Sequence, residues 1–443
     1  MSEHRHFSRT GAIVDLRAIR ENMAALKAAA KEVNPEIKAL ATVKADAYGH
    51  GACEVANAVD DIADMFSVAC TDEGIELREA GGIKKPILIL GPVFAEDDDD
   101  TIRYGLTQAV FTAERLQQLN DNAARYAREN GTDPEILRAE AESTGDKAGE
   151  ILALMREERK QKEDAKDGED YSFADGKAHV HIAVDTGMSR IGVTPDDDGL
   201  AVLKLAAELP YISVDGIFTH FATADETDKT GANKALSKFR AFKSMAEAAG
   251  IRIPCWHCAN TASIIDGIGL EGFDMCRVGI GLYGMYPSRE VKTDRVSLQP
   301  ALMWYAYITH VKWIEAGTSV SYGYKFTADK RMRIGTVSIG YADGYSRSLS
   351  LKGTEVLVNG RRCPILGRIC MDQMMIDLSA FDEGEVFAGV PAILLGGTPE
   401  AEAAAYGYEP KCISAEELAD RIGTINYEVT CNISKRVPRK YIR

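Results

Sequence analysis

Several residues of the sequence could do chemistry because they lie at or just beyond the ends of apolar runs. They are Lys44, Arg190, His220, His257 and Arg277. Lys44 follows the apolar residues ALATV, and such surroundings disfavour an ammonium ion and lower the pKa of a lysine. A neutral lysine can form a Schiff base, an arginine fork suits a planar carboxylate, and histidine exchanges protons near neutral pH. Taken singly, each of these residues would more often have a structural role.

The apolar runs predict the elements that would position these side chains. From about residue 14 to residue 295, they alternate with Ala-rich amphipathic stretches, which is the pattern of a parallel βα architecture. The eight runs are 37–44, 65–70, 86–90, 107–111, 178–184, 212–220, 252–258 and 273–280. Eight repeats favour an α/β fold with a closed (β/α)8 TIM-like barrel, and an open doubly wound sheet is the alternative. Reactive residues of such barrels lie at the carboxyl ends of the strands.

The residue composition and pattern of the sequence change after the barrel region. Residues 296–443 contain β-branched and aromatic segments separated by turn signals, and they predict a mainly antiparallel β domain, to which residues 1–13 could add a strand. Residues 133–177 are dominated by Glu, Asp, Lys and Ala. We expect them to form a solvated or mobile insert on the barrel face opposite the reactive rim.

The composition narrows the classes of function. The chain of 443 residues has a formal net charge of −15, which would repel nucleic acid, and it has no run of roughly twenty apolar residues that could cross a membrane. Nine irregularly spaced cysteines, and an N-terminus without the apolar core of a signal peptide, indicate a reduced, cytoplasmic protein. The CWHC segment at 255–258 lies on a predicted strand without a second cysteine pair, so we expect no metal site.

One motif gives the reactive residues a common interpretation. VKADAYGHG at 43–51 resembles the lysine segment of alanine racemases, which are fold-type III pyridoxal-phosphate enzymes. The resemblance continues in DTGMSRIG (185–192), THFATAD (219–225), HCANTAS (257–263), RVGIGLYGMYPS (277–288), VSYG (320–323), IGYADGY (339–345), CMDQ (370–373) and NYEVTCNISKRVPR (426–439). It implies a barrel with a C-terminal β domain, and an isomerase that interconverts L-alanine and D-alanine with pyridoxal 5'-phosphate and supplies D-alanine for peptidoglycan.

Carried over residue by residue, the resemblance assigns two catalytic bases. Lys44 matches the lysine that holds the cofactor as an aldimine and serves the D-antipode as a base. Tyr322 matches the base for the L-antipode. Racemisation needs such a pair because the α-proton must leave one face of a planar intermediate and return on the other. The family's tyrosine comes from the partner subunit, so the resemblance implies an obligate homodimer with composite active sites.

The remaining assignments concern the cofactor and the substrate. Arg277 matches the arginine facing the pyridine nitrogen, His220 the histidine stacked on the ring, and His257 the residue that orients Arg277. The phosphate is expected where the loops after the seventh and eighth strands meet, at Asn260, Thr261, Gly279 and Ile280, with Tyr48 and Tyr427 matching further phosphate contacts. Arg190 and the Met371 backbone match contacts to the substrate carboxylate. Tyr341, Tyr427 and Asp372 would narrow or support the entrance.

The sequence departs from the family pattern mainly at Ala183. Many members have a lysine there, carbamylated in some, that braces the carboxylate-binding arginine. Thr261 and Ser189 are milder departures, and the insert has no counterpart. These changes leave room for a broad-specificity or serine-preferring racemase. A non-enzymatic pyridoxal-phosphate carrier, which would lack the β domain, and a decarboxylase of related fold, whose cysteine-centred signature is not seen around CMDQ, are weaker alternatives.

Overall fold

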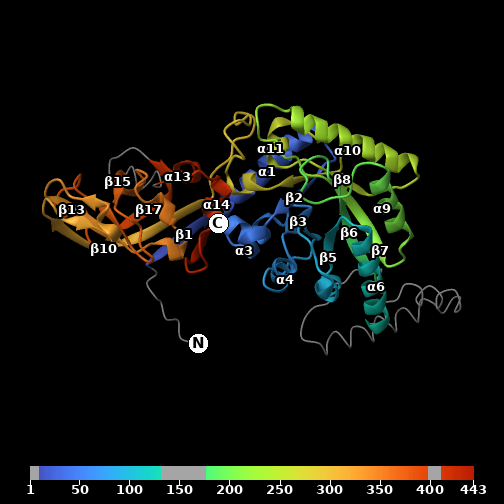
Figure 1. Cartoon of the computed structure of the whole chain (residues 1–443), viewed down its shortest axis with the longest axis horizontal. Helices are drawn as coiled ribbons and strands as arrows, with labels where there is room; N and C mark the ends of the chain where they lie inside the picture. The colour runs from blue at the N-terminus through green and yellow to red at the C-terminus, as the bar shows by residue number, and fades with distance from the viewer. Residues whose placement is uncertain (1–8, 131–175, 398–410) are drawn as a thin grey trace.

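The computed structural model describes residues 9–130, 176–397 and 411–443. Figure 1 shows a ring of strands surrounded by helices, followed by an elongated β-rich domain. The predicted insert at 133–177 lies outside the described residues except for residues 176–177, and so does most of the segment 1–13.

The first part of the chain forms a closed barrel of parallel strands. In chain order they are β2 (Lys38–Thr42), β3 (Met65–Val68), β4 (Ile87–Ile89), β5 (Leu106–Val110), β6 (Ala178–Ala183), β7 (Ile212–Phe218), β8 (Cys255–His257) and β9 (Met275–Val278). β9 pairs with β2, so each strand has two neighbours and no edge is left open. The predicted closed barrel is confirmed, and the open doubly wound alternative is wrong.

Helices cover the outside of the barrel, and the longer ones each bury an apolar face against it. The helices are α1 (Leu16–Val33), α3 (Ala52–Val59), α4 (Thr71–Glu79), α5 (Asp98–Arg103), α6 (Ala113–Asn130), α9 (Asp197–Glu208), α10 (Thr230–Ala248) and α11 (Thr261–Asp266). In α1, Asp15 caps the N-terminus, and the buried residues Ile19, Met23 and Leu26 recur every three to four positions. Within the described ranges, no helix combines the length and the apolar character needed to span a bilayer.

The second part is a nine-stranded sheet with the order β18-β17-β14-β15-β16-β13-β10-β1-β19. Its strands are β1 (Thr10–Asp15), β10 (Leu302–Ile314), β13 (Met332–Val337), β14 (Glu355–Val358), β15 (Arg361–Leu366), β16 (Met374–Asp377), β17 (Pro391–Gly397), β18 (Cys412–Ile413) and β19 (Arg439–Ile442). A separate pair is formed by β11 (Ser319–Val320) and β12 (Phe326–Thr327). Only β1 and β19 pair in parallel, so the predicted antiparallel-rich β domain is confirmed.

The end of the chain returns to the barrel. α13 (Ala415–Ile422) leads to α14 (Asn426–Cys431), which packs beside the loop that follows β2. The approach is so close that a Cβ at Gly49 would lie 2.2 Å from the carbonyl oxygen of Thr430. α14 thereby carries Tyr427 to the carboxyl end of the barrel.

Candidate active site

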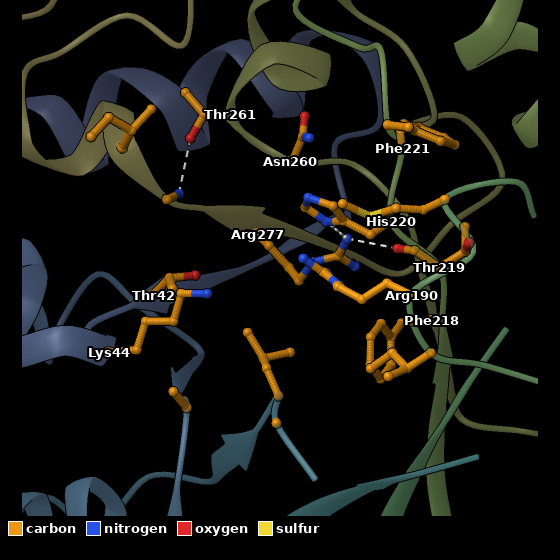
Figure 2. A pocket seen from close by; sticks show the side chains of 18 of the residues that line it. Thr42, Lys44, Arg190, Phe218, Thr219, His220, Phe221, Asn260, Thr261 and Arg277 are labelled. Atoms are coloured by element: carbon orange, nitrogen blue, oxygen red, sulfur yellow. Dashed lines mark hydrogen bonds between the residues drawn. The ribbon is translucent and has the colours of Figure 1, made fainter. Parts of the chain in front are cut away.

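A cavity of about 690 Å³ opens at the carboxyl ends of the barrel strands. Its wall includes the last residues of β2, β6 and β7 and residues that follow β3, β4, β8 and β9. The sequence-predicted residues that line it are Lys44, Tyr48, Arg190, His220, Asn260, Thr261, Arg277, Gly279, Ile280 and Tyr427. The fold thus gathers most of the predicted cofactor and substrate residues around one space, which Figure 2 shows from close by.

Lys44 begins a left-handed turn. β2 ends at Thr42, and the turn α2 (Lys44–Gly49) has φ values of 52–53° at the four successive residues from Ala45 to Tyr48. Left-handed backbone costs an L-residue roughly 1–2 kcal/mol, so such a run persists only where its surroundings hold it. The strained segment follows directly after the lysine that lines the cavity.

The carboxylate of Glu73 holds the start of this turn. One oxygen accepts from the Ala45 amide and the other from the Ala69 amide, each at 2.7 Å. Because Ala69 follows β3, Glu73 ties the lysine turn to the neighbouring barrel strand. Farther along, the Asp46 carboxylate accepts from the Ala52 amide at 2.9 Å and anchors the end of the turn.

The surroundings of Lys44 favour its neutral form. Burial lowers the pKa of the Lys44 ammonium group, and the positive charges of Arg190 and Arg277 lower it further, while Glu73 opposes the shift. A lysine so placed reaches its neutral form at a lower pH than a surface lysine does. The neutral amine is the form that adds to a carbonyl group.

Arg277, on β9, is 5% exposed and is held by neutral acceptors. Its guanidinium donates to the Thr219 carbonyl oxygen at 2.7 Å. It also donates to His220 Nδ1 at 3.2 Å and to His257 Nδ1 at 2.8 Å. Figure 2 shows Arg277 beside His220 and Thr219. Burial lowers the pKa of Arg277 to about 10, so the group is still a cation at neutral pH.

The two imidazoles beside Arg277 are neutral. A guanidinium only donates, so each Nδ1 accepts and carries no proton. Burial, reinforced by Arg277, lowers the pKa of His220 to about 3 and lowers the pKa of His257 well below its usual value. His220 lines the cavity, whereas His257 lies behind Arg277 and is fully buried. These positions are compatible with the predicted roles in contacting the cofactor and orienting Arg277.

Hydroxyl groups surround Gly279. The Thr261 hydroxyl accepts from the Gly279 amide at 2.9 Å, and a Cβ at 279 would lie 3.6 Å from both the Thr261 and the Tyr48 hydroxyl oxygens. Tyr427 packs against Tyr48, with 5.9 Å between the ring centroids. The Asn260 side-chain oxygen caps α11 and so fixes the start of the helix that carries Thr261. This group of donors suits an anion such as a phosphate.

Arg190 reaches the cavity without a hydrogen-bond or ion-pair partner in the part of the chain that the structure describes. Ala183, where the family pattern has the bracing lysine, is buried with Ala109 and Phe218 in an apolar cluster. No side chain from position 183 can therefore brace the guanidinium. The Arg190 fork is open toward the carboxylate of a bound molecule.

Four predicted residues lie outside this cavity, on the β domain. Tyr322, in the 3-10 turn η4 (Tyr322–Tyr324), is 66% exposed, and Met371 and Tyr341 are 53% and 40% exposed. Asp372 pairs with Arg436 at 2.8 Å. The single chain does not bring these residues to the cavity that Lys44 lines.

The loops that carry these residues lie against one another. The Tyr341 amide donates to the Cys370 carbonyl oxygen at 3.2 Å, and the Ser321 hydroxyl donates to the Arg368 carbonyl oxygen at 2.5 Å. Ser321 and Cys370 also touch, with 3.6 Å between Oγ and Sγ. The segments 321–324, 340–343 and 368–372 therefore lie together, and we call the surface formed by their exposed side chains the loop face.

The sequence does not single out two residues that the structure places in or behind the site. Glu73 lies near the start of α4, and its only sequence signal is a carboxylate just after a predicted strand. His181 lies inside the apolar run 178–184 and contacts His257. A polar residue flanked by apolar ones on a buried strand was the available signal for His181.

Fold and site together define an enzyme built on a closed (β/α)8 barrel with a C-terminal β domain, in which a lysine and two arginines face one cavity. Sequence models of alanine racemases match nearly the whole chain: the N-terminal domain matches residues 14–287 and the C-terminal domain matches residues 301–441. The chain belongs to the alanine racemase family, and it is an isomerase.

Individual relatives agree with this family. Alanine racemase of Desulforamulus reducens is 38% identical over 97% of this chain and 98% of its own length. Alanine racemase 1 of Bacillus subtilis is 36% identical over 100% of this chain and 95% of its own. The solved alanine racemase of Clostridium difficile 630 has a TM-score of 0.79 at 34% identity, covering 99% of this chain and 97% of that one. The structure from Bacillus anthracis with bound L-Ala-P has a TM-score of 0.78 at 32% identity, covering 99% and 96%.

Proposed function

We propose that the chain interconverts L-alanine and D-alanine, with pyridoxal 5'-phosphate held by Lys44 and with Tyr322 of a second subunit as the opposite base. The observation that carries this proposal is the separation of the two residues. Lys44 lines the cavity, whereas Tyr322 is exposed on the loop face. One copy of the chain would supply the lysine, and a second copy would supply the tyrosine.

The residues of the cavity fit this cofactor. Lys44 is an amine with a lowered pKa, which suits an aldehyde. The Thr261 and Tyr48 hydroxyls around Gly279 suit a phosphate. Arg277 offers N–H donors, which suit the acceptor nitrogen of a pyridine ring. Aldehyde, phosphate and ring nitrogen would each meet a matched group of this chain.

The chain's own residues would move the proton. Bound at Lys44, the cofactor would draw electrons from the substrate α-carbon and make its proton acidic enough to leave. The substrate amine would take the place of the Lys44 amine on the cofactor, and Lys44, then free and neutral, would take or return that proton on one face of the α-carbon. Tyr322 of the second subunit would do so on the other face. Two bases on opposite faces invert the configuration, whereas one base alone would return the proton to the face it left.

Arg277 would limit side reactions. It donates hydrogen bonds but keeps its proton, because even its lowered pKa of about 10 lies above neutral pH. Arg277 would therefore hold the ring nitrogen without protonating it, which keeps electron withdrawal moderate. A ring that withdraws electrons only moderately favours prompt return of the α-proton over transamination.

Arg190 and the apolar part of the cavity would select the substrate. The Arg190 fork would bind the carboxylate, with the Met371 backbone of the second subunit as a further contact. Leu90, Ala183 and Phe218 also line the cavity and suit a small apolar side chain. Tyr341 and Asp372 on the loop face, with Tyr427, would narrow the entrance and favour alanine over larger amino acids.

We further infer an obligate homodimer in the cytoplasm that supplies D-alanine for peptidoglycan. The loop face supports the dimer, because it exposes Tyr322 and Met371, whose chain neighbours Ser321 and Cys370 are in contact. Cofactor, substrate and second subunit would complete the site together.

Racemisation assays on variants test the proposal. Wild-type enzyme should show the visible absorbance of lysine-bound cofactor and racemise both antipodes, and Lys44→Ala should lose both properties. Tyr322→Phe should keep the absorbance and lose racemisation, yet still exchange the α-proton of D-alanine with deuterated solvent. Tyr126→Phe is the matched control, because Tyr126 lies on the outer helix α6, away from both the cavity and the loop face. A colourless but active wild type would overturn the cofactor assignment, and a fully active Tyr322→Phe variant would overturn the second base.

A substrate panel decides between a strict and a broad racemase. Alanine, serine, lysine and arginine should be compared at equal enzyme concentration. We expect the highest kcat/KM for alanine, and a clear preference for any of the other three would reject the alanine assignment.

A further inference from the structure

A second histidine continues the hydrogen-bond chain behind Arg277. His181, on β6, is 2% exposed, and its Nδ1 lies 2.9 Å from His257 Nε2. His257 Nδ1 in turn accepts from Arg277 at 2.8 Å. The chain therefore runs from the cavity through Arg277 and His257 to His181, which does not line the cavity itself.

The barrel makes room for the His181 ring. The pairing of β6 with β7 shifts register between Val180 and His181, and Gly216 lies opposite the histidine. A Cβ at Gly216 would lie 2.6–2.8 Å from three atoms of the His181 ring, so only glycine leaves space for it. A register shift and a glycine together fix the ring against His257.

The hydrogen bonds determine where the ring protons are. The Arg277 guanidinium only donates, so His257 Nδ1 must accept and the single proton of neutral His257 is on Nε2. That proton is donated to His181 Nδ1, which must therefore be bare. Burial lowers the pKa of His181 to about 4, in agreement with a neutral ring. Both histidines are then neutral and protonated on Nε2.

We propose that His181 is a positioning residue for the racemase reaction, because its Nδ1 accepts from His257 Nε2 and so stabilises the His257 tautomer that accepts from Arg277. This inference rests on the proposed function, which places Arg277 at the ring nitrogen of the cofactor. In the other tautomer, the Nδ1–H of His257 would face an N–H of Arg277, and two donors cannot bond. Arg277 would then lose an acceptor and move away from the position that the ring requires.

Two variants of similar size separate the acceptor from the packing. His181→Asn keeps an oxygen able to accept near the position of Nδ1, whereas His181→Leu fills the same space without an acceptor. In the holoenzyme, His181→Leu should shift the visible absorbance of the bound cofactor and lower kcat on the order of tenfold, with KM little changed, because a buried donor is left unpaired. His181→Asn should restore the absorbance and most of kcat.

His179→Leu is the control on the same strand. His179 pairs with Asp215, which lies on β7, at 2.6 Å. We expect this variant to leave the cofactor absorbance and the split between kcat and KM unchanged. The proposal is overturned if His181→Leu has the kcat and cofactor absorbance of the wild type. It is also overturned if His181→Asn loses as much kcat as His181→Leu.

Imidazole ¹⁵N shifts of the wild-type holoenzyme test the proposal even if His181→Leu fails to fold. Histidine-labelled protein should show His257 and His181 protonated on Nε2 and bare on Nδ1, with signals assigned through His181→Asn. A proton on Nδ1 of either ring overturns the proposal. If the wild type holds no cofactor, the proposed function fails instead, while the tautomers of the same protein still test His181.

Discussion

Glu73 accepts a hydrogen bond from the amide of Ala45 at 2.7 Å, directly after Lys44. Its second oxygen accepts from the Ala69 amide, so a Glu73→Leu variant leaves two backbone donors without their partner. We expect this change to lower the free energy of unfolding by about 1–3 kcal/mol and to weaken cofactor retention. Urea unfolding and absorbance after dialysis measure the two effects. Glu76→Leu, at an exposed position of the same helix, should leave both near wild type.

The left-handed turn predicts opposite effects of one substitution at two sites. Ala45 is exposed with a φ of 53°, a conformation that glycine adopts without penalty. Ala45→Gly should raise the free energy of unfolding by about 1 kcal/mol. Ala28→Gly, at an exposed position within α1, should lower it by about 0.5–1 kcal/mol. If denaturant unfolding shows that both substitutions change the free energy of unfolding in the same direction, the strain at Ala45 is contradicted.

Buried histidines predict a loss of stability in acid. Burial lowers the pKa of His50 and of His181 to about 4 and that of His220 to about 3, whereas an unfolded histidine titrates near 6.5. Between these values the unfolded chain binds more protons, so stability is complete above about pH 6.5 and falls as the pH drops toward 4. The urea midpoint of the apoprotein should be lower at pH 5 than at pH 7. Replacing the exposed His310 with glutamine should leave this difference unchanged.

The open fork of Arg190 predicts a substrate-binding defect. Arg190→Lys keeps the charge but loses the two-pronged geometry, so KM for alanine should rise roughly tenfold, with a smaller change in kcat. Steady-state kinetics with both antipodes measure this. Arg289→Lys, at an exposed arginine paired with Asp420, is the control. An unchanged KM in Arg190→Lys would exclude Arg190 as the carboxylate ligand.

The barrel could be predicted from the sequence because its strands are short apolar runs separated by amphipathic helices. The run predicted at 212–220, for example, is β7 at Ile212–Phe218. The exit of β2 could not be predicted in the same way. Residues 45–48 are ordinary for a right-handed turn, and their left-handed backbone depends on Glu73 and on the close approach of Thr430 to Gly49.

Part of the site also depends on geometry that no local pattern contains. Arg277 could be placed at the end of a strand, but its two imidazole partners come from β8 and from the residues after β7, which the pairing of β7, β8 and β9 brings together. His181 joins the hydrogen-bond network of Arg277 through its contact with His257, which lies on a different strand. Tyr322 is the opposite case: the motif predicts its role, yet one chain leaves it exposed and outside the cavity.

The central claim is that Lys44 and Tyr322 act in one site although they belong to different subunits. Mixing the inactive variants Lys44→Ala and Tyr322→Phe, with unfolding and refolding to exchange subunits, tests it most directly. A heterodimer would contain one site with both native residues and one with neither, so statistical mixing should restore about a quarter of wild-type activity. Each variant refolded alone should stay inactive. A mixture that remains inactive, although tagged heterodimers are recovered from it, would contradict the composite site.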